Sequence, residues 1–581
     1  MAVRKKSVRD IRAKAVELLK AERGASPKPR GGRTTVALVY PNTYSVGMSS
    51  LGYQVVYRLI NDRPDALAER VFLPDDIDEF KASGAPLFAL ESQSPVRDFE
   101  VVAFSVSYEN DYINVAKMFR LAGLPPSARD RSGAYPLVVL GGVCASFNPE
   151  PISDFFDAVI IGEAEEVLPV FLDIYDANKF DLSREALLRR LAEIPGVYIP
   201  SLYGPEYNPD GTVKAIRPRA DNIPARIVRR FVADLEAHPA HSVILTPNTE
   251  FSDMFMVEVS RGCGRHCRFC MAGYAYRPPR SRSVASVLRQ VEQGVKLTRK
   301  IGLVGAAISD YPEIAGLVGK LRDIDVDFSA SSLRADSLTP EIVALVSKGN
   351  RTVAIAPEAG SERLRGVINK NITEEQILRA VRMLIAGGVL NVRLYFMVGL
   401  PTETDDDIAA IVELAKKAHE TQLEAARGKG RIGTLTLSVN CFIPKPWTPF
   451  QWDAMEGVDS LDDKMRRIKK ELKGVSNISV INDVPKYAVL QCALSRGDRG
   501  LADVIVHAAE TGMDLKKAFA EKGLSMDFYA GRKRGAGEVF PWDFIDTGIK
   551  KEYLLKESER ARGGCKTPPC KVGSCKSCGV C

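Results

Sequence analysis

Short, unbroken apolar runs alternate with helical patterns along most of this 581-residue chain. Unbroken runs are typical of parallel strands that helices cover on both faces. The first part of the chain has four such runs, each ending at Gly, Ser or Pro: residues 36–40, 101–105, 137–140 and 158–161. The pattern predicts an α/β chain that begins with a doubly wound parallel sheet. In such a sheet a ligand lies beyond the carboxyl ends of the strands.

A second strand–helix series begins near residue 250. One of its helices starts at Thr373 with a capping-box pattern and stops at Gly387. Six βα units in succession predict an open, partial barrel whose active face lies at the carboxyl ends of its strands. The six expected strands are residues 254–260, 305–309, 326–329, 352–356, 392–398 and 434–439.

Changes of pattern divide the chain into five parts. An amphipathic helix and a Pro- and Gly-rich linker come first, and a mainly helical region follows the barrel. The last residues are rich in Cys, Lys, Gly and Pro. The expected parts, in chain order, are the helix with its linker (1–33), the doubly wound domain (34–220), the barrel (221–475), the helical region (476–560) and the cysteine-rich tail (561–581).

Composition excludes several classes of protein. Apolar residues make up 45% and charged residues 26%, which is ordinary globular usage rather than that of a disordered or collagen-like chain. No window approaches 18 unbroken apolar residues, and no apolar stretch follows the basic N-terminus. We therefore expect no membrane span, no secretory signal and a cytoplasmic location. The net charge of +7 fits an anionic substrate or RNA without establishing either.

Eight of the eleven cysteines lie in two tight clusters. In a reducing compartment, clustered cysteines indicate metal ligands rather than disulfides. Cys263, Cys267 and Cys270 have C-x3-C-x2-C spacing directly after an expected strand. A zinc site prefers four ligands, whereas three thiolates on an iron–sulfur cubane leave one iron open. The alternatives are a structural zinc loop or chance clustering.

At this motif the sequence resembles the radical S-adenosylmethionine (SAM) superfamily. The aromatic Phe269, directly before the last cysteine, fits as well. The resemblance implies a 4Fe-4S cluster whose open iron chelates the amino and carboxylate groups of SAM. An electron from a reductant such as flavodoxin or ferredoxin then cleaves SAM to a 5′-deoxyadenosyl radical.

The resemblance also assigns SAM contacts by position. Ser309 and Asp310, at the end of the second expected strand, stand where the family holds the methionine amino group, usually with Gly-Gly-Glu. Glu358 resembles the position that binds the ribose. Ser331 and Arg334 follow the third expected strand and would reach the carboxylate, although Ser331 equally suits a surface loop.

The first domain resembles the cobalamin-binding domain of one large radical SAM class. Four strand-end segments would face one ligand together, and the candidate cobalamin contacts on them are Asn42, Tyr44, Gly47, Ser105, Ser107, Gly141, Gly142, Gly162 and Glu163. Many such domains supply an Asp-x-His-x-x-Gly loop whose histidine ligates cobalt, but here residues 42–47 read Asn-x-Tyr-x-x-Gly. No histidine lies within residues 34–200, so no histidine of this domain can ligate cobalt from below. The alternative is a flavodoxin-like domain with another ligand or none.

Segments farther along the chain extend this resemblance to nearly its whole length. They match a bacterial family of cobalamin-binding radical SAM proteins with no assigned substrate. The segments are residues 149–150, 162–165, 395–403, 442–450, 495–499 and 541–543.

The tail holds five cysteines within 17 residues, on a segment with almost no apolar residues. Its C-x2-C-x2-C spacing favours an auxiliary iron–sulfur cluster, with zinc as the alternative. The expected ligands are Cys570, Cys575, Cys578 and Cys581, with Cys565 left over. The isolated Cys144, Cys441 and Cys492 are expected to be buried and inert.

The predicted activity is cobalamin-dependent radical methylation of an unactivated carbon. A second hypothesis keeps both cofactors but catalyses oxidation, rearrangement or cyclisation. A third is a non-catalytic iron–sulfur and cobalamin sensor. The sequence leaves the substrate open among a small molecule, a peptide and RNA.

Overall fold

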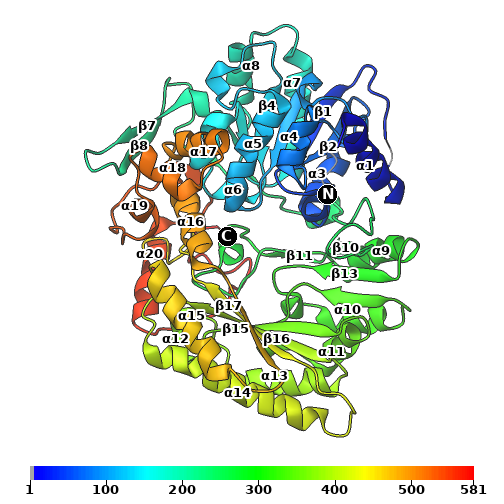
Figure 1. Cartoon of the computed structure of the whole chain (residues 1–581), viewed down its shortest axis with the longest axis vertical. Helices are drawn as coiled ribbons and strands as arrows, with labels where there is room; N and C mark the ends of the chain where they lie inside the picture. Colours follow the sequence, from blue (N-terminus) through cyan, green and yellow to red (C-terminus); the bar gives the residue numbers. More distant parts are fainter. Residues whose placement is uncertain (1–5, 26, 581) are drawn as a thin grey trace.

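The computed structural model describes residues 6–25 and 27–580. Two α/β units lie one above the other in Figure 1, and C-terminal helices run along one side of both. The expected N-terminal helix is present as α1 (Val8–Ala21), which begins with a capping box between Ser7 and Asp10. Among the described residues, no helix has the length and apolar character needed to cross a membrane.

The first unit is built on a six-stranded sheet with the order β2-β1-β3-β4-β5-β6. Strands β1 to β5 are parallel, and β6 runs antiparallel to β5. The predicted parallel sheet is therefore confirmed, and its order is that of flavodoxin-like doubly wound folds. The strands are β1 (Thr34–Tyr40), β2 (Ala66–Phe72), β3 (Val101–Ser105), β4 (Leu137–Gly141), β5 (Ala158–Ile160) and β6 (Val197–Tyr198).

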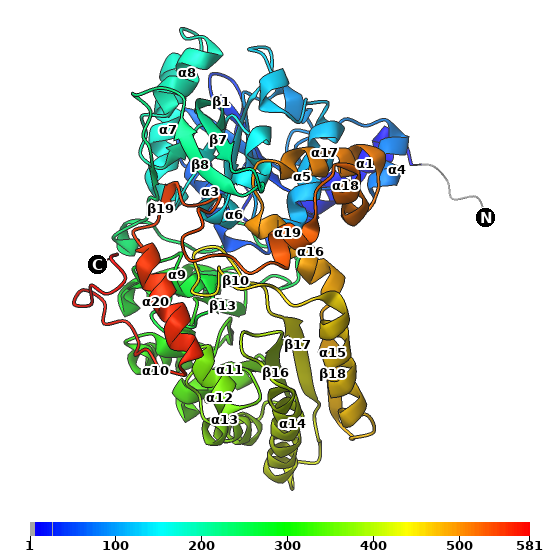
Figure 2. The same ribbon diagram turned by 90° about the vertical axis from the view of Figure 1, so that its left-hand side faces the viewer.

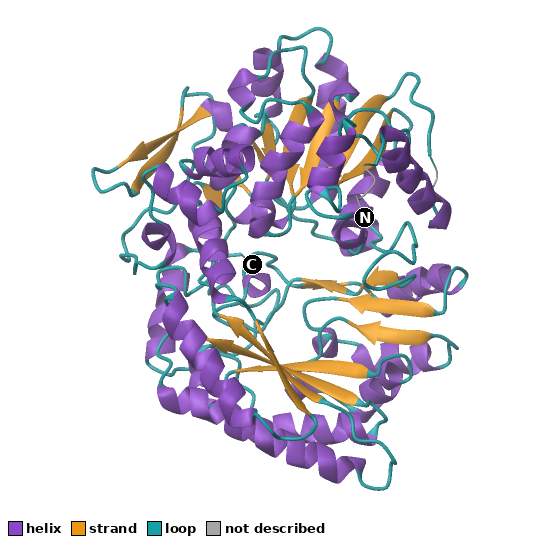
Figure 3. Ribbon diagram, in the orientation of Figure 1, coloured by secondary structure: helices purple, strands orange, loops and turns teal. Residues whose placement is uncertain are grey.

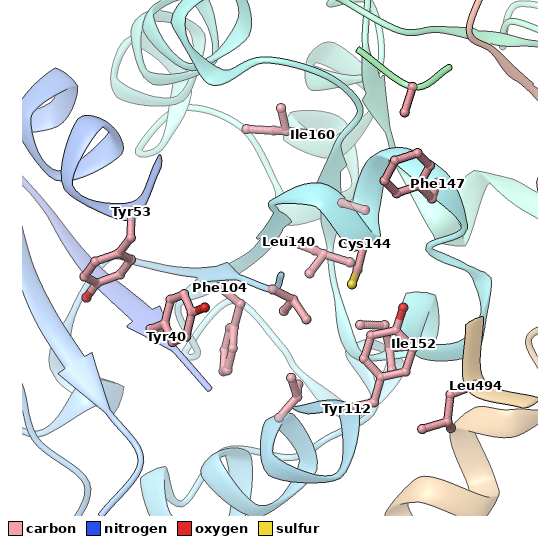
Figure 4. Packing of buried hydrophobic residues seen from close by; sticks show 14 of the residues in the cluster. Tyr40, Tyr53, Phe104, Tyr112, Leu140, Cys144, Phe147, Ile152, Ile160 and Leu494 are labelled. Atoms are coloured by element: carbon pink, nitrogen blue, oxygen red, sulfur yellow. The ribbon is translucent and has the colours of Figure 1, made fainter. Parts of the chain in front are cut away.

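Helices pack apolar side chains against this sheet. Figure 4 shows Phe104 of β3 and Leu140 of β4 near Tyr112 of α5, with Leu494 of α16 at the edge of the same core. The Phe104 ring stacks on the ring of Phe119 in α5, with centroids 5.3 Å apart. The helices are α2 (Tyr44–Met48), α3 (Leu51–Asn61), α4 (Ile77–Ser83), α5 (Tyr112–Ala122), α6 (Val143–Phe147), α7 (Ala164–Asn178) and α8 (Arg184–Leu191).

Strand β2 was not expected from the sequence, because charged residues stand in its middle. Glu69 and Arg70 are both buried there. The Arg70 guanidinium donates to the carboxylates of Glu22 and Glu91, each at 2.7 Å. These ion pairs form only in the folded chain, so the buried strand reads as a polar segment in the sequence.

The second unit contains five of the six predicted strands and two more. They form two parallel sheets, β10-β13-β14 and β15-β16-β17-β18, which Figure 3 shows as two separate groups of strands. The strands are β10 (Phe255–Glu258), β13 (Lys300–Val304), β14 (Asp327–Ala330), β15 (Thr352–Glu358), β16 (Asn391–Val398), β17 (Leu435–Cys441) and β18 (Ile478–Asn482). The helices are α9 (Val284–Val295), α10 (Ile314–Arg322), α11 (Pro340–Ser347), α12 (Glu362–Val367), α13 (Glu374–Ala386), α14 (Asp405–Ala426) and α15 (Val458–Leu472). The capping box at Thr373, at the start of α13, is confirmed.

Two details of the predicted barrel are wrong. The second strand is β13, and residues 305–309, expected to form it, lead into a 3-10 turn at Ile308–Asp310. Gly305 and the two alanines after it offer no branched side chains for a strand, whereas Ile301 and Leu303 are buried in β13. Strand β18 lies in the region expected to be helical, as a half-exposed edge strand with a weak apolar pattern.

The rest of the C-terminal region is helical, as predicted. Helices α15, α16 and α17 follow one another from the barrel up to the first unit in Figure 2, α18 lies beside α17, and α17 packs on α5. The helices are α16 (Pro485–Arg496), α17 (Leu501–Thr511), α18 (Leu515–Glu521), α19 (Met526–Ala530) and α20 (Lys551–Arg562). Three short strand pairs complete the fold: β7 (Tyr203–Tyr207) with β8 (Val213–Pro218), β9 (Ile227–Val228) with β19 (Ile545–Asp546), and β11 (Ser260–Arg261) with β12 (Arg280–Ser281).

Candidate functional site

The cysteine loop, residues 262–275, begins directly after β11 at the carboxyl end of β10. It starts at Gly262, whose φ is +81° and where a Cβ would lie 2.2 Å from the Tyr276 carbonyl oxygen. Only glycine allows this close approach. The loop therefore leaves the strand in a tight turn that carries Cys263, Cys267 and Cys270 toward one another.

Of the three thiols of the loop, Cys267 is buried, and Cys263 and Cys270 are half-buried. Burial and the neighbouring thiols raise the pKa of Cys270 to about 12, and burial also raises the pKa of Cys263. A bound metal cation would offset the cost of burying a negatively charged thiolate. The thiols would then lose their protons, because the thiolate is the form that binds a metal. Among the described residues no three His, Cys, Asp or Glu side chains are arranged around a single metal ion. A cubane binds each thiolate at a different iron, so three separated thiols from one loop fit it.

Ser309 and Asp310 lie beside the cysteine loop. Arg265, inside the loop, donates from Nε to Asp310 at 2.7 Å, and Ser337 donates to the same carboxylate at 3.0 Å. The Ser309 hydroxyl accepts the backbone N–H of Arg334 at 3.0 Å. The two predicted residues therefore lie next to the loop. They belong to a 3-10 turn rather than to a strand, and Asp310 forms an ion pair with Arg265.

Arg334 and Ser331 differ in their surroundings. The buried Arg334 guanidinium donates to both carboxylate oxygens of Asp336 at 3.0 and 3.1 Å, and its charge acts on Cys267. Ser331 is exposed, and its hydroxyl bonds to the backbone of Gly305 at the end of β13. Arg334 is thus placed at the cysteine loop, whereas Ser331 joins two strand ends at the surface.

Glu358 ends β15 in a left-handed conformation, with φ +69°, after an irregularity in the pairing with β16. A non-glycine residue held there costs about 1–3 kcal/mol, and such strain clusters at functional sites. Lys370 donates to its carboxylate at 3.1 Å, and both side chains are largely buried. Lys370 and Glu358 therefore form an ion pair at the carboxyl end of β15.

Replacing Glu358 with alanine is expected to weaken SAM binding while leaving the iron content intact. The loss of a carboxylate that accepts ribose hydroxyls is worth about 1.5–3 kcal/mol, or roughly 10- to 150-fold in affinity. Equilibrium binding of SAM to the reconstituted protein measures it. The exposed Glu375→Ala on α13 is the matched control, and unchanged affinity in Glu358→Ala would remove Glu358 from the site.

Phe269 anchors the cysteine loop to a separate small core. This core joins the ends of β15 to β17 to α12 and α20, and its buried members are Ala359, Leu364, Val367, Ile368, Met397, Leu400, Phe442, Phe450 and Ala561. The expected position of Phe269 beside Cys270 is therefore also a packing position.

A cavity of about 450 Å³ lies between the two α/β units. From the first sheet it is lined by Ser105, Ser107, Gly142, Gly162 and Glu163; from the cysteine loop by Ala272, Ala275 and Tyr276; and from the end of β13 by Val304, Gly305 and Ala306. The carboxyl ends of the first sheet and of β10 and β13 in the barrel thus open on one space, although none of the three motif cysteines is among its lining residues. No histidine lies among the lining residues.

Residues 41–47, directly after β1, are not among the lining residues of this cavity, whereas Ser50 and the start of α3 are. The Tyr44 hydroxyl donates to Glu22 at 2.6 Å, and its ring lines another cavity beneath α1. Asn42 donates to Asp111 at 2.9 Å, and Gly47 lies against Phe72. Gly141, at the end of β4, is also absent from the lining. The buried Glu22–Arg70 pair draws the Tyr44 loop toward α1 instead.

Glu163 clasps the two units together. Its carboxylate accepts from Arg261 at 2.7 Å and Arg280 at 2.8 Å, both on the strands that flank the cysteine loop. Burial alone would raise the pKa of Glu163, but the Arg280 hydrogen bonds and the Arg261 charge lower it. Beside it, a Cβ on Gly162, whose φ is +126°, would lie 2.0 Å from the Arg230 carbonyl oxygen. Residues expected to contact a cofactor therefore also hold the inter-unit joint.

Three segments of the wider resemblance meet at a second joint. Asn148 donates to the carbonyls of Ser495 at 3.1 Å and Gly497 at 2.8 Å. Arg499 donates to Glu150 at 3.0 Å in a buried pair, and the Trp447 indole donates to the Phe147 carbonyl at 3.1 Å. These segments fasten the first unit to the C-terminal region, and nothing in their sequences indicated this partnership.

The tail lies along the cysteine loop. The Cys570 N–H donates to the Gly264 carbonyl at 2.7 Å. The Asn369 amide donates to the carbonyls of Arg265, His266 and Thr567. Of the expected tail ligands, Cys578 is buried, Cys570 and Cys575 are half-buried, and Cys581 lies outside the described residues. The two cysteine clusters, distant in sequence, are therefore neighbours.

Arg265, Lys370 and His266 are residues of the site that the sequence reasoning missed. The Arg277 guanidinium lies 2.7 Å from Nδ1 of His266 and can only donate, which assigns the ring proton to Nε2. The Tyr553 hydroxyl lies 2.7 Å from the same nitrogen. Burial and the Arg277 charge lower the pKa of His266 to about 3, which keeps the ring neutral. Its place between two cysteines of the motif was the available signal.

Cys144, Cys441 and Cys492 are buried, as expected. In Figure 4 the sulfur of Cys144 points toward the hydroxyl of Tyr112. Burial raises the pKa of Cys441 to about 12, and burial likewise raises the pKa of the other two. These thiols are kept protonated inside the core.

Comparisons with known proteins extend to both units. Residues 52–200 match the family model described as radical SAM proteins, N-terminal, and residues 257–415 match that of the radical SAM superfamily. An uncharacterized protein of Methanocaldococcus jannaschii is 31% identical over 526 residues, which cover 90% of this chain and 98% of the relative. An uncharacterized methyltransferase of Pyrococcus horikoshii is 26% identical, with 48% of this chain and 58% of that relative covered.

Among solved structures, the apo form of the cobalamin-dependent SAM radical enzyme OxsB matches with a TM-score of 0.42 and 16% identity, covering 66% of this chain and 52% of that one. The superfamily implies a 4Fe-4S cluster, SAM, a reductant and a substrate. With both units matched and a relative of nearly full coverage sharing 31% identity, this chain belongs to the radical SAM superfamily of enzymes.

Proposed function

We propose that this radical SAM enzyme is cobalamin-dependent and methylates an unactivated carbon. The observation that carries the proposal is the cavity of about 450 Å³ onto which the carboxyl ends of the first sheet and of β10 and β13 open. Ligands of doubly wound sheets and of βα barrels bind at those ends. A cofactor on the first sheet and SAM on the barrel would therefore share one space.

The roles of the chain's own residues follow from their positions. Cys263, Cys267 and Cys270 would hold the cluster, with Arg334 and Asp310 beside them. Glu358, held by Lys370, would accept the ribose hydroxyls. When bound, SAM and cobalamin would supply a 5′-deoxyadenosyl radical and a methyl group.

The cobalamin contacts are proposed only where the structure has a cavity wall. Ser105, Ser107, Gly142 and Gly162 combine small side chains with backbone that a large planar ligand could approach closely. No histidine is among the lining residues, so serine and glycine segments rather than an imidazole would hold the cofactor. Tyr44 stands where many cobalamin-binding domains have a histidine, and its hydroxyl donates a hydrogen bond to Glu22.

The products formed from SAM test this function. Reduced, reconstituted protein incubated with SAM and cobalamin is expected to release both 5′-deoxyadenosine and S-adenosylhomocysteine, because methyl transfer consumes one SAM for each product. Liquid chromatography with mass spectrometry measures both. Deoxyadenosine alone would support oxidation, rearrangement or cyclisation in place of methylation. Neither product in catalytic amounts would support the sensor.

We infer that the tail holds an auxiliary iron–sulfur cluster through Cys570, Cys575, Cys578 and Cys581. The tail is too polar and too rich in Gly and Pro to order itself by burial, so ligation would supply most of its folding energy. Its hydrogen bonds to Gly264 and Asn369 support a metal centre next to the cysteine loop.

Truncation after Gly564 is expected to lower bound iron by about one cubane, leaving about four irons per chain. SAM cleavage should survive in part because the first ligand set is separate, although the loop loses its contacts with Thr567 and Cys570. Iron and zinc analysis of the purified protein measures this, with Cys565→Ser as the matched control. Loss of zinc at constant iron would replace the cluster with a structural zinc site, and no change in either metal would overturn both.

A further inference from the structure

A second cavity, of about 540 Å³, lies at the opposite end of the barrel from the cysteine loop. It opens between the amino ends of β15, β16 and β17, where three connections enclose it: residues 347–351, 388–390 and 429–433. Gln422 and Ala426 of α14 form part of its wall. The proposed function makes no use of this end of the barrel.

Four cationic side chains and no carboxylate line this basic cavity: Lys348, Arg351, Lys429 and Arg431. The Lys429 ammonium donates to the last carbonyls of α13, at Ile385 and Ala386, which holds the charge at that helix end. Lys348 donates at 2.9 Å to Asp325, which is highly exposed and is shared with Arg299. The charge in the cavity is therefore only partly offset.

The two arginines have no counter-charge. Neither the Arg351 nor the Arg431 side chain forms an ion pair or hydrogen bond with any residue that the structure describes. Like charges gathered in one hollow repel each other, and an anion between them would convert that repulsion into attraction. A guanidinium matches the oxygens of a phosphate with two parallel hydrogen bonds.

Gln422 provides an independent sign of a ligand. The residue is completely buried, and its Nε2 donates to the Gly433 carbonyl at 2.9 Å. Its Oε1 is buried without a hydrogen-bond partner among the described residues. Turning the amide over would set that oxygen against the Gly433 carbonyl, so the donor to Gly433 fixes the orientation. The wall of the cavity thus carries an acceptor that requires an O–H or N–H donor.

We propose that the basic cavity binds a small phosphate monoester that carries hydroxyl groups, as sugar phosphates and nucleotides do. The phosphoryl group would lie between Arg351 and Arg431, and a ligand hydroxyl would donate to Gln422. The volume of the basic cavity, about 540 Å³, lies within the range of small-molecule sites. The site is new and is separate from the cavity between the two units.

Isothermal titration calorimetry on the full-length, reconstituted protein tests the site. The probes are glucose 6-phosphate, adenosine 5′-monophosphate, glucose and sulfate. We expect at least one of the two monoesters to bind, sulfate to bind more weakly and glucose not to bind. The two monoesters distinguish a sugar phosphate from a nucleotide as the preferred class.

Two variants and a control locate the binding. The double substitution Arg351→Gln with Arg431→Gln is expected to lower the affinity for the monoester by at least about tenfold. Gln422→Leu should lower the affinity for the monoester severalfold. It should leave the affinity for sulfate unchanged, because sulfate has no hydroxyl to donate to Gln422. Arg379→Gln, on the exposed side of α13, makes the same change of charge elsewhere and should alter nothing.

Three results would overturn the proposal. They are the absence of monoester binding at millimolar concentration, binding that the double substitution leaves intact, and binding of a short RNA oligomer by a protein that ignores both monoesters. Equal effects of Gln422→Leu on monoester and sulfate would remove Gln422 from the contact. Circular dichroism of each variant confirms that it has folded.

Discussion

Replacing any one of Cys263, Cys267 or Cys270 with alanine is expected to abolish SAM cleavage. Each thiol comes from the same short loop, and a cubane held by two protein thiolates is poorly retained. The loss should exceed about 100-fold, the upper range for removing a residue that only supports a metal ligand. Deoxyadenosine formation by the reduced, reconstituted protein measures the activity, and iron analysis measures retention of the cluster.

The isolated cysteines supply the matched control for this series. Cys441 of β17 and Cys492 of α16 are buried in the core and are not among the residues that line the cavity between the units. The same substitution to alanine there should cost packing energy but leave SAM cleavage in place. A loop variant with normal deoxyadenosine formation would contradict the assignment of these thiols as the cluster ligands.

Substituting Arg499 with methionine is expected to lower the free energy of unfolding by about 3–5 kcal/mol. Arg499 donates to Glu150 and to the carbonyls of Pro200 and Tyr203 from a largely buried position. The substitution leaves the Glu150 carboxylate buried with no cationic partner in the pair. Urea unfolding followed by tryptophan fluorescence measures the loss, and Trp447 reports directly on this joint.

Two further variants separate this mechanism from lost packing. Adding Glu150→Leu to Arg499→Met removes the unpaired charge and should recover most of the stability, as replaced buried ion pairs often do. Arg466→Met breaks an exposed pair with Asp463 and should cost less than about 1 kcal/mol. An Arg499→Met protein as stable as the parent would show that the joint does not depend on this pair.

The proximity of the two cysteine clusters has a consequence for electron supply. The tail crosses the cysteine loop at Gly264, and Asn369 joins the loop to the tail with three hydrogen bonds. A metal centre in the tail would therefore stand beside the cluster that cleaves SAM. This geometry connects the iron content of the tail to the activity of the loop in one experiment.

Local patterns in the sequence determined much of the fold. The unbroken apolar runs predicted nine of the parallel strands closely, because burial on both faces imposes that pattern on each strand separately. The capping box predicted the start of α13 for a similar local reason. The spacing of Cys263, Cys267 and Cys270 placed the loop, since ligands so close in sequence are held by one turn of chain.

Two other strands, β2 and β18, could not be predicted because their residues lack a local apolar pattern. Glu69 and Arg70 make β2 read as polar, and only Glu22 and Glu91, far away in the sequence, allow those charges to be buried. The edge strand β18 is half-exposed, so few of its residues need to be apolar. The end of β13 at Val304 was misplaced although the local residues indicated it, since Gly305 and the two alanines after it lack branched side chains.

The tertiary structure decided which of the candidate site residues line the cavity and which bind other side chains. Sequence position placed Tyr44 and Glu163 together beside a cofactor. Glu22 instead holds Tyr44 toward α1, whereas Glu163 lines the cavity while Arg261 and Arg280 bind it at the joint between the units. Each outcome depends on a charged partner from a distant segment. A sequence determines which residues can be strand ends or metal ligands, whereas long-range pairing of buried charges decides which of them face the cavity.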